Sequence, residues 1–437
     1  MSGRATARRT LAWAALALLG AGCAGATPDA PDYRGIPQWS SRAIPEARGA
    51  FRTAPDGKRT AVRYAGWTTR DFDRFATYAY GDQRPDPAVQ RVTMPPGVVG
   101  DPQKGRALFM NRSKGPCYAC HLVPGDDVWP AGSAGPDQST LGDRKLPDQY
   151  LYQVVWDARA LFPNTVMPPW GTAGIFSPEE IVDLVAYLQT LKGPVPPEKD
   201  PNRNPFTRAR PAGFGDNLDP TNNPALLLAD DAEAVWAERG PSGKACGDCH
   251  EGGAARAMRG VATRYPKFVK TYGRVMSVED FLTMHVPETT GREMRSESND
   301  NLNMSVLIKR ASNGLPVSVD LESPEARAAL ARGKATFHRK VGERNHACAD
   351  CHTPDAAAGK FLSGRLLADV RTGLTRHFPT WRTDRAEIWD MRKRFQWCMT
   401  PLGMNMLAAD SIEYAELELY LTSFDNGKPL SVPGIRH

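Results

Sequence analysis

Three copies of the pattern Cys-x-x-Cys-His constrain this chain of 437 residues more than any other feature, because they take six of its eight cysteines. Two thiols one helical turn apart can each form a thioether with a haem vinyl group, and the adjacent histidine then lies under the iron. A single copy could be a zinc-binding or redox-active cysteine pair, but three complete copies predict three covalently bound haem c groups. The predicted attachment sites and proximal ligands are Cys117, Cys120 and His121, then Cys246, Cys249 and His250, then Cys348, Cys351 and His352.

The amino terminus predicts export. Arg4, Arg8 and Arg9 precede an uncharged stretch at 11–22, which is too short to span a bilayer and has the form of a signal-peptide core. Bacteria attach c-type haem outside the cytoplasm, so the motifs and the leader support each other. We therefore expect residues 1–26 to be a signal peptide and the protein to reach the periplasm.

Two ways of processing this leader remain open. Small residues at 24–26 allow ordinary cleavage before Thr27, whereas residues 18–23 resemble a bacterial lipobox with Cys23 as the acylated residue. Such a lipid anchor is the one contact with a membrane that we expect. The pair Arg8-Arg9 also resembles a twin-arginine signal, but addition of haem after unfolded export favours the general secretion route.

Length and spacing of the motifs indicate about three domains. We predict an all-α fold of three class I cytochrome c-like domains with irregular connections rich in Pro and Gly. The expected segments after the leader are an N-terminal extension at 27–96 with a short helix near 69–79, a cytochrome domain at 97–192, a linker at 193–223, and two cytochrome domains at 224–322 and 323–437. The formal charge of +6 includes the leader arginines and omits the haem propionates, so it predicts no nucleic-acid partner.

The first and third domains repeat one pattern. Gly105 and Phe109 lie four residues apart after a helix-capping signal, and Gly333 and Phe337 repeat that spacing. A glycine on a helix lets another helix cross closely, as the closing helix of a cytochrome c does. The expected closing helices begin after Ser177 and near Asp410.

The sixth ligand of each iron decides between electron transfer and chemistry. In the first domain Met167 lies in a Met-Pro-x-x-Gly loop and is the predicted ligand. In the third domain Cys398 and Met399 compete for the corresponding place. Cys398 would give a thiolate-ligated iron and Met399 an ordinary electron carrier, and the residues alone leave both open.

Several strings resemble the SoxA subunit of the thiosulfate-oxidising Sox system. They are Gly-Val-Ala-Thr-Arg-Tyr-Pro-Lys at 260–267, the third motif at 347–352, Phe-Pro-Thr-Trp-Arg at 378–382, Arg-Lys-Arg-Phe-Gln-Trp-Cys at 392–398 and Leu-Glu-Leu-Tyr-Leu at 417–421. Residues 101–191, with Gly135-Pro136, Asp157-Ala158-Arg159 and the Met167 loop, resemble its partner SoxX. The chain as a whole thus resembles a natural SoxX–SoxA fusion.

This resemblance implies an L-cysteine S-thiosulfotransferase. Such an enzyme joins thiosulfate oxidatively to the terminal cysteine of the carrier SoxYZ, and the electrons leave through haem to a small c-type cytochrome or another acceptor. It implies that Cys398 is the distal ligand of the third haem and is found as a persulfide. Arg382 matches an active-site arginine of the family and Arg394 is a second match; guanidinium groups suit the oxyanion of thiosulfate.

One string departs from the family. Where two-haem SoxA proteins carry Cys as distal ligand of the first haem, this chain reads Leu-Thr-Met-His-Val at 282–286. We therefore expect His285 and His250 to form a bis-His site, with the alternatives Met284, Met294 and Met304. The remaining histidines are expected to be structural or solvated: His338, His346, His377 and His437.

Two other functions fit the same residues. A thiosulfate dehydrogenase, which couples two thiosulfates to tetrathionate, also uses a cysteine-ligated haem. A non-catalytic tri-haem electron carrier would have Met399 on its third iron.

Overall fold

The computed structural model describes residues 88–193 without 113, 126, 127 and 129, residues 204–207, and residues 223–436 without 343, 400–406 and 408. Before these it describes one strand pair, β1 (Arg52–Thr53) with β2 (Thr60–Ala61). The predicted signal peptide, Cys23, the helix near 69–79, most of the linker and His437 lie outside the described residues. None of the described helices has the length and apolarity needed to cross a bilayer.

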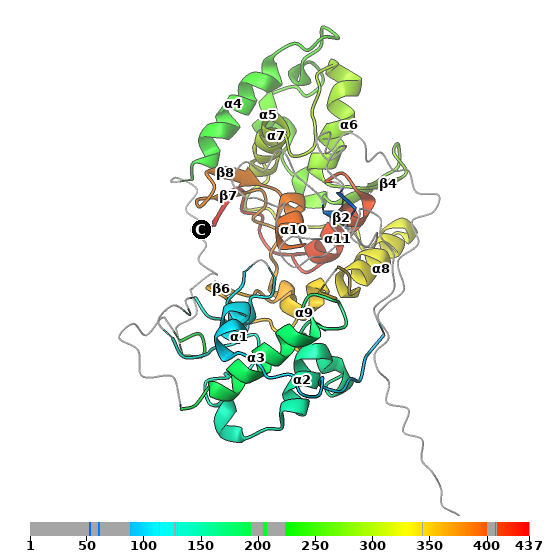
Figure 1. Ribbon diagram of the computed structural model, residues 1–437. Helices are drawn as coiled ribbons and strands as arrows, with labels where there is room; N and C mark the ends of the chain where they lie inside the picture. The colour runs from blue at the N-terminus through cyan, green and yellow to red at the C-terminus, as the bar shows by residue number, and fades with distance from the viewer. Residues whose placement is uncertain are drawn as a thin grey trace, which may run out of the picture.

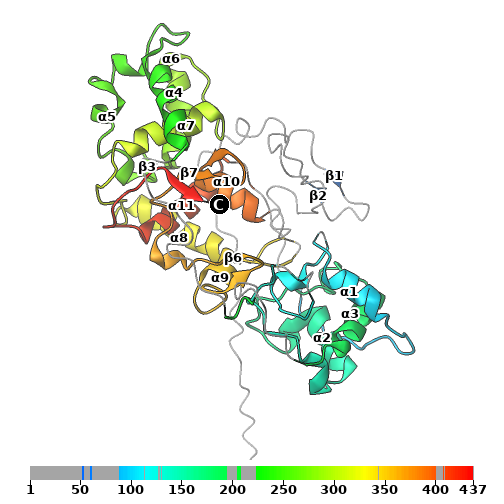
Figure 2. The same ribbon diagram turned by 90° about the vertical axis from the view of Figure 1, so that its left-hand side faces the viewer.

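The elements form three groups with one haem motif each, here called the first, second and third units (97–192, 224–322 and 323–437). Figures 1 and 2 show that their order in space differs from their order in the chain, because the third unit lies between the other two. The third unit therefore contacts both neighbours. These boundaries remain those predicted from the sequence.

The first unit is built on three helices, α1 (Pro102–Phe109), α2 (Asp148–Asp157) and α3 (Pro178–Thr190), with short 3-10 turns at Cys117–Ala119, Leu141–Arg144 and Ala158–Ala160. Asp101 caps α1 by accepting from the backbone N–H groups of Gln103 and Lys104. Ser177 and Glu180 form a reciprocal capping box on α3. Both helices begin where the sequence signals predict.

Glycine allows α1 and α3 to cross closely. A Cβ on Gly105 would lie 1.9 Å from the carbonyl oxygen of Asp183, so a larger residue would push the helices apart. One turn later Phe109 packs edge-on against Tyr187 with ring centroids 5.5 Å apart. The crossing encloses one side of the space beside the first haem motif.

The third unit repeats this crossing with α8 (Pro324–His338) and α11 (Ile412–Ser423). A Cβ on Gly333 would lie 2.1 Å from the carbonyl oxygen of Glu416. Phe337 contacts Tyr420 with centroids 5.4 Å apart. The internal repeat expected from the sequence is thus present in three dimensions.

The second unit contains α4 (Ala225–Ala237), α5 (Gly253–Ala257), α6 (Val278–Thr290) and α7 (Asn299–Arg310), with 3-10 turns at Cys246–Asp248 and Ala262–Arg264 and the strands β3 (Lys267–Val269) and β4 (Arg274–Met276). The third unit adds α9 (Cys348–His352), α10 (Met391–Met399), a 3-10 turn at Val370–Thr372, and the strands β5 (Phe361–Leu362), β6 (Arg365–Leu366), β7 (Thr380–Arg382), β8 (Glu387–Trp389) and β9 (Gly434–Arg436).

The second and third units share apolar cores. Val275 of β4 and Val317 are buried in one cluster with Ala329 of α8 and Leu419 of α11. Ile388 of β8 packs in another cluster with residues of α4 and α7. The predicted boundary between residues 322 and 323 therefore falls within continuous packing rather than at a hinge.

The small sheets are the main departure from the expected all-α fold. β3–β4 and β5–β6 are antiparallel hairpins, and β7 pairs antiparallel with β8 and parallel with β9. Each of these strands has two or three residues, too few to show the period-2 alternation that marks a strand in a sequence. They matter because β6 and β7 carry arginines to the candidate site.

Candidate active site

The three haem motifs adopt the same local geometry. Backbone N–H groups of His121 and His250 donate to the carbonyls of Cys117 and Cys246, four residues earlier, at 2.9 and 3.0 Å. The third motif forms the short helix α9. In each case one helical turn places the two thiols and the imidazole on one face, as two thioethers and an axial ligand require.

Two of the predicted proximal histidines are oriented by backbone carbonyls. Nδ1 of His121 lies 2.8 Å from the carbonyl oxygen of Pro136, and Nδ1 of His352 lies 2.8 Å from that of Ala368. A carbonyl only accepts, so each Nδ1 carries the proton and Nε2 keeps its lone pair for a metal. Gly135 passes so close that a Cβ there would lie 2.3 Å from Cε1 of His121.

One cavity of about 1240 Å³ joins the first and third units. Its wall contains both haem motifs and both predicted distal sulfur ligands, namely Cys117, Cys120, His121, Met167, Cys348, Cys351, His352 and Cys398. The rest is largely apolar, with Phe109 and Phe337 from the two helix crossings. Covalent attachment points, an axial nitrogen and an apolar lining are what haem c needs, so these residues fit the group.

The structure separates the two sulfur atoms at the end of α10. Met399 Sδ accepts a hydrogen bond from the Tyr414 hydroxyl at 3.3 Å. The Cys398 thiol instead lies close to the His352 imidazole, which helps to lower the pKa of the thiol, and both side chains line the cavity. Because Met399 is engaged by Tyr414 and Cys398 lies beside His352, the structure favours Cys398 over Met399 as the side chain that would hold a haem iron together with His352.

Positive charge surrounds the sulfur of Cys398. Burial alone would raise the pKa of this thiol. Arg394, His352 and Arg365 outweigh that effect and lower the pKa to about 7. The Arg394 and Arg365 guanidiniums both lie over the ring of Trp397, at 5.1 and 4.5 Å from its centroid. The two guanidiniums place positive charge near the thiol, and a pair of guanidinium groups can bind an oxyanion.

Arg382 lines another part of the same cavity. Its guanidinium lies 5.1 Å from the ring centroid of Trp389, and its Nε is 3.7 Å from an Asp384 carboxylate oxygen. Trp389 in turn contacts Trp397 at 6.0 Å. Both arginines proposed from the sequence therefore reach the cavity. Sequence reasoning missed Arg365, because it lies outside the strings that carry the family resemblance.

The second unit brings His250 and His285 together. Their ring centroids lie 6.2 Å apart, and His285 stacks on Phe281 at 4.8 Å. Two metal–imidazole bonds of about 2 Å each place ring centroids roughly 6 Å apart, so one iron fits between them. Met294 and Met304 are buried in the apolar cluster beside Cys246. The geometry favours His285 as the distal partner of His250.

Three other histidines have structural surroundings, as expected. His338 packs edge-on against Phe337, His346 lies 3.5 Å from an Asp350 carboxylate oxygen, and His377 is buried.

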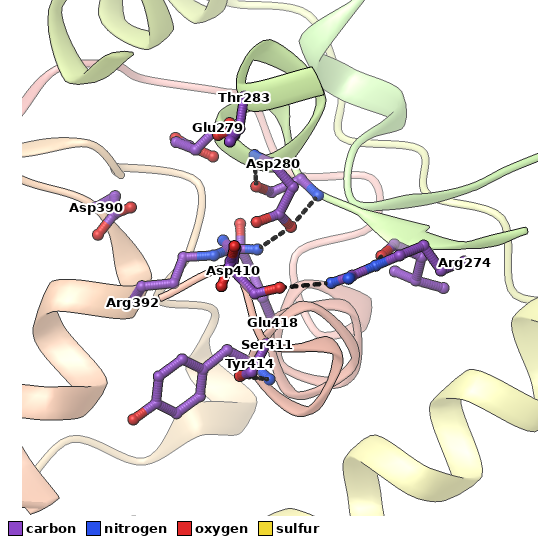
Figure 3. A network of polar contacts seen from close by, with 12 residues as sticks. Arg274, Glu279, Asp280, Thr283, Asp390, Arg392, Asp410, Ser411, Tyr414 and Glu418 are labelled. Carbon is purple, nitrogen blue, oxygen red and sulfur yellow. Dashed lines mark hydrogen bonds and ion pairs between the residues drawn. The ribbon is translucent and has the colours of Figure 1, made fainter. Parts of the chain in front are cut away.

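A buried ion network fixes the helix that carries Cys398. Arg392, in the first turn of α10, is fully buried. It donates to Asp280 of α6 at 2.7 Å and pairs with Glu418 of α11 (Figure 3). Arg274 of β4 donates to the backbone carbonyl of Asp410 at 2.8 Å. The helices that present His285 and Cys398 are thus tied together through charges removed from solvent.

Comparison with known proteins places these features in a family. The family model for the SoxA/TsdA cytochrome c domain matches residues 231–317 and 332–430. The L-cysteine S-thiosulfotransferase subunit SoxA of Rhodovulum sulfidophilum is 30% identical over 223 residues, which cover 50% of this chain and 75% of that protein. The chain belongs to the SoxA family of cytochromes c. It therefore binds haem c covalently.

The comparisons found further similar proteins. SoxA of Paracoccus pantotrophus is 29% identical over 50% of this chain and 73% of the relative. A chain in the crystal structure of SoxXA from P. pantotrophus has 28% sequence identity to this protein and a TM-score of 0.46. The match covers 50% of this chain and 80% of that chain. Residues 100–188 match the family model for cytochrome c oxidase, cbb3-type, subunit III. This SoxA-family chain thus carries an additional cytochrome c domain ahead of its SoxA part.

Proposed function

We propose that this protein is a thiosulfate-oxidising haem enzyme that conjugates thiosulfate to a cysteine of a SoxYZ-like carrier protein. The observation that carries the proposal is that Cys398 lies close to His352 in a cavity that Arg394 and Arg365 also line, with both guanidiniums over the ring of the neighbouring Trp397. A sulfur atom and two guanidinium groups that can bind an anion line the same cavity. The names of the relatives, L-cysteine S-thiosulfotransferase subunits, describe this reaction.

The proposed reaction balances as an oxidation. The carrier thiol and the outer sulfur of thiosulfate form a new S–S bond, the thiol loses its proton, and two electrons leave. Bound haem c groups supply one-electron acceptors for those electrons. The cysteine S-thiosulfonate product keeps the sulfonate group of thiosulfate.

Each residue has a proposed role. Arg394, Arg365 and Arg382 neutralise and orient the oxyanion by charge-assisted hydrogen bonds. Cys398, as a thiolate or persulfide, is a polarizable sulfur nucleophile that can be attacked and released by exchange-type steps. Trp397 holds two guanidiniums by cation–π contact and limits their motion.

The remaining sites serve electron transfer in this proposal. We assign three haem c groups, with ligand pairs His121 and Met167, His250 and His285, and His352 and Cys398. The first unit acts as a SoxX-like domain that passes electrons to a small c-type cytochrome or another acceptor. The protein works in the periplasm, and Cys23 is the residue that would anchor it to a membrane.

A reconstitution experiment tests the function. Purified holoprotein is incubated with thiosulfate and an oxidised acceptor, with and without a SoxYZ-like carrier, and the carrier is weighed by mass spectrometry. The carrier should gain one thiosulfonate. A carrier variant with Ser in place of its terminal Cys is the control. The family description also covers TsdA, and acceptor reduction with tetrathionate formation in the absence of carrier would identify a thiosulfate dehydrogenase instead.

A further inference from the structure

The hairpin β5–β6 carries Arg365 to the candidate site and rests on the first unit. Leu362 and Arg365 pair across a two-residue turn of Ser363 and Gly364. Arg365 follows directly after the turn, and its guanidinium lies 4.5 Å from the centroid of Trp397, the residue before Cys398. The position of this charge therefore depends on what holds the hairpin.

Four hydrogen bonds from backbone groups and one side chain of the first unit hold the hairpin. The N–H groups of Ser133 and Ala134 both donate to the carbonyl of Phe361, at 2.8 and 3.2 Å. The N–H of Phe361 donates to Ser133 Oγ at 3.1 Å. The N–H of Ser363 donates to the carbonyl of Ala119 at 2.7 Å. Four hydrogen bonds thus join the hairpin to a neighbouring cytochrome unit, and Ala119 lies inside that unit's haem motif.

Two further observations show that the hairpin and the first unit pack closely at this contact. A Cβ on Gly132 would lie 1.8 Å from the carbonyl oxygen of Ala119 and 2.7 Å from that of Phe361, so only glycine fits between them. Ser363 has φ of 50°, a left-handed conformation that residues with a side chain adopt reluctantly. Its N–H is the donor to Ala119, so the contact with the first unit helps to hold the turn.

We propose that the first unit completes the substrate-anion site of the third, because it positions the β5–β6 hairpin so that Arg365 faces the Cys398 cavity. Arg365 is then a substrate-binding residue, and Gly132 and Ser133 are positioning residues that act through it. The ligand is a sulfur oxyanion with two or three terminal oxygens. This inference rests on the proposed function for the identity of the substrate.

The test uses the full chain with its haems attached. Arg365→Ala should raise KM for thiosulfate about 10- to 100-fold, as expected for the loss of one charge-assisted hydrogen bond, and Arg365→Lys should recover part of the loss. Gly132→Ala, which displaces the hairpin from the side of the first unit, should raise KM as well. Arg371→Ala removes an exposed arginine of the same unit and should leave KM unchanged.

The double variant decides whether the first unit acts through Arg365. In the Arg365→Ala background, Gly132→Ala should raise KM no further, because both changes remove the same contact. Fully additive effects, or an unchanged KM in Arg365→Ala, would overturn the proposal. If Gly132→Ala lowers haem attachment, Ser133→Ala takes its place in the cycle, since it removes only the oxygen that accepts from Phe361.

Binding of sulfate, which does not react, separates this inference from the proposed function. Calorimetric titration of the oxidised holoprotein with sulfate should show weaker binding in Arg365→Ala and Gly132→Ala than in the wild type. If the wild type does not turn over thiosulfate but shows this pattern, the anion site stands and the proposed function fails. Sulfate affinity that is equal in all variants, with wild-type turnover of thiosulfate intact, overturns the role of Arg365 alone.

Discussion

Replacement of Arg392 by Met should destabilise the fold more than the loss of any exposed ion pair would. The side chain is fully buried and pairs with Asp280 and Glu418, which are 1% and 4% exposed. Met keeps most of the volume but leaves two carboxylates without their cation. Breaking a buried pair in this way costs about 3–5 kcal/mol of the free energy of unfolding.

The measurement is urea unfolding of the holoprotein followed by far-ultraviolet circular dichroism. With a slope of about 2–3 kcal/mol per molar urea, the midpoint should fall by roughly 1–2.5 M. Arg295→Met is the matched control, because Arg295 pairs with Glu293 at 2.9 Å while both side chains are largely exposed. That pair should contribute less than about 1 kcal/mol. Equal midpoints for the two variants would refute the view that burial of the network stabilises the junction of the second and third units.

Four further outcomes are expected. Cys398→Met should keep three haems and a folded protein but abolish thiosulfate-dependent reduction and conjugation; retained turnover would exclude the proposed mechanism. Met167→Ala should open one axial site, so that carbon monoxide binds to the reduced first haem, and unchanged spectra would mean that another residue is the ligand. His285→Met should raise the reduction potential of the second haem, because a thioether favours ferrous iron relative to imidazole; potentiometry that finds no change would place His285 away from the iron. Gly333→Ala should lower the free energy of unfolding, since its Cβ would meet the Glu416 backbone, while Ala331→Gly on the same helix should cost only about 1 kcal/mol.

Local signals predicted much of this molecule. The haem motifs fix covalent chemistry within five residues, and the helix starts at Asp101 and Ser177 depend on caps that need no distant partner. The crossing at Gly105 was predictable because a small residue followed by an aromatic one turn later implies a close helix neighbour.

Other features depend on contacts between distant parts of the chain. Arg394 is four residues before Cys398 on one helix, so its proximity follows from helical periodicity. Arg365 lies over Trp397, the residue before Cys398, on a hairpin that is hydrogen-bonded to the first unit, and no spacing in the sequence encodes that arrangement. Arg392 stands in a run of three basic residues that resembles a solvated surface, whereas its partners come from α6 and α11.

The hydrogen-bonded contact between the β5–β6 hairpin and the first unit decides how the first and third units respond to dilution. Because both units belong to one polypeptide, their association is intramolecular and does not depend on the concentration of the protein. A contact of four hydrogen bonds need not compete with the translational entropy that separate subunits lose on binding. The first and third units are therefore expected to stay paired in a one-to-one ratio at any protein concentration.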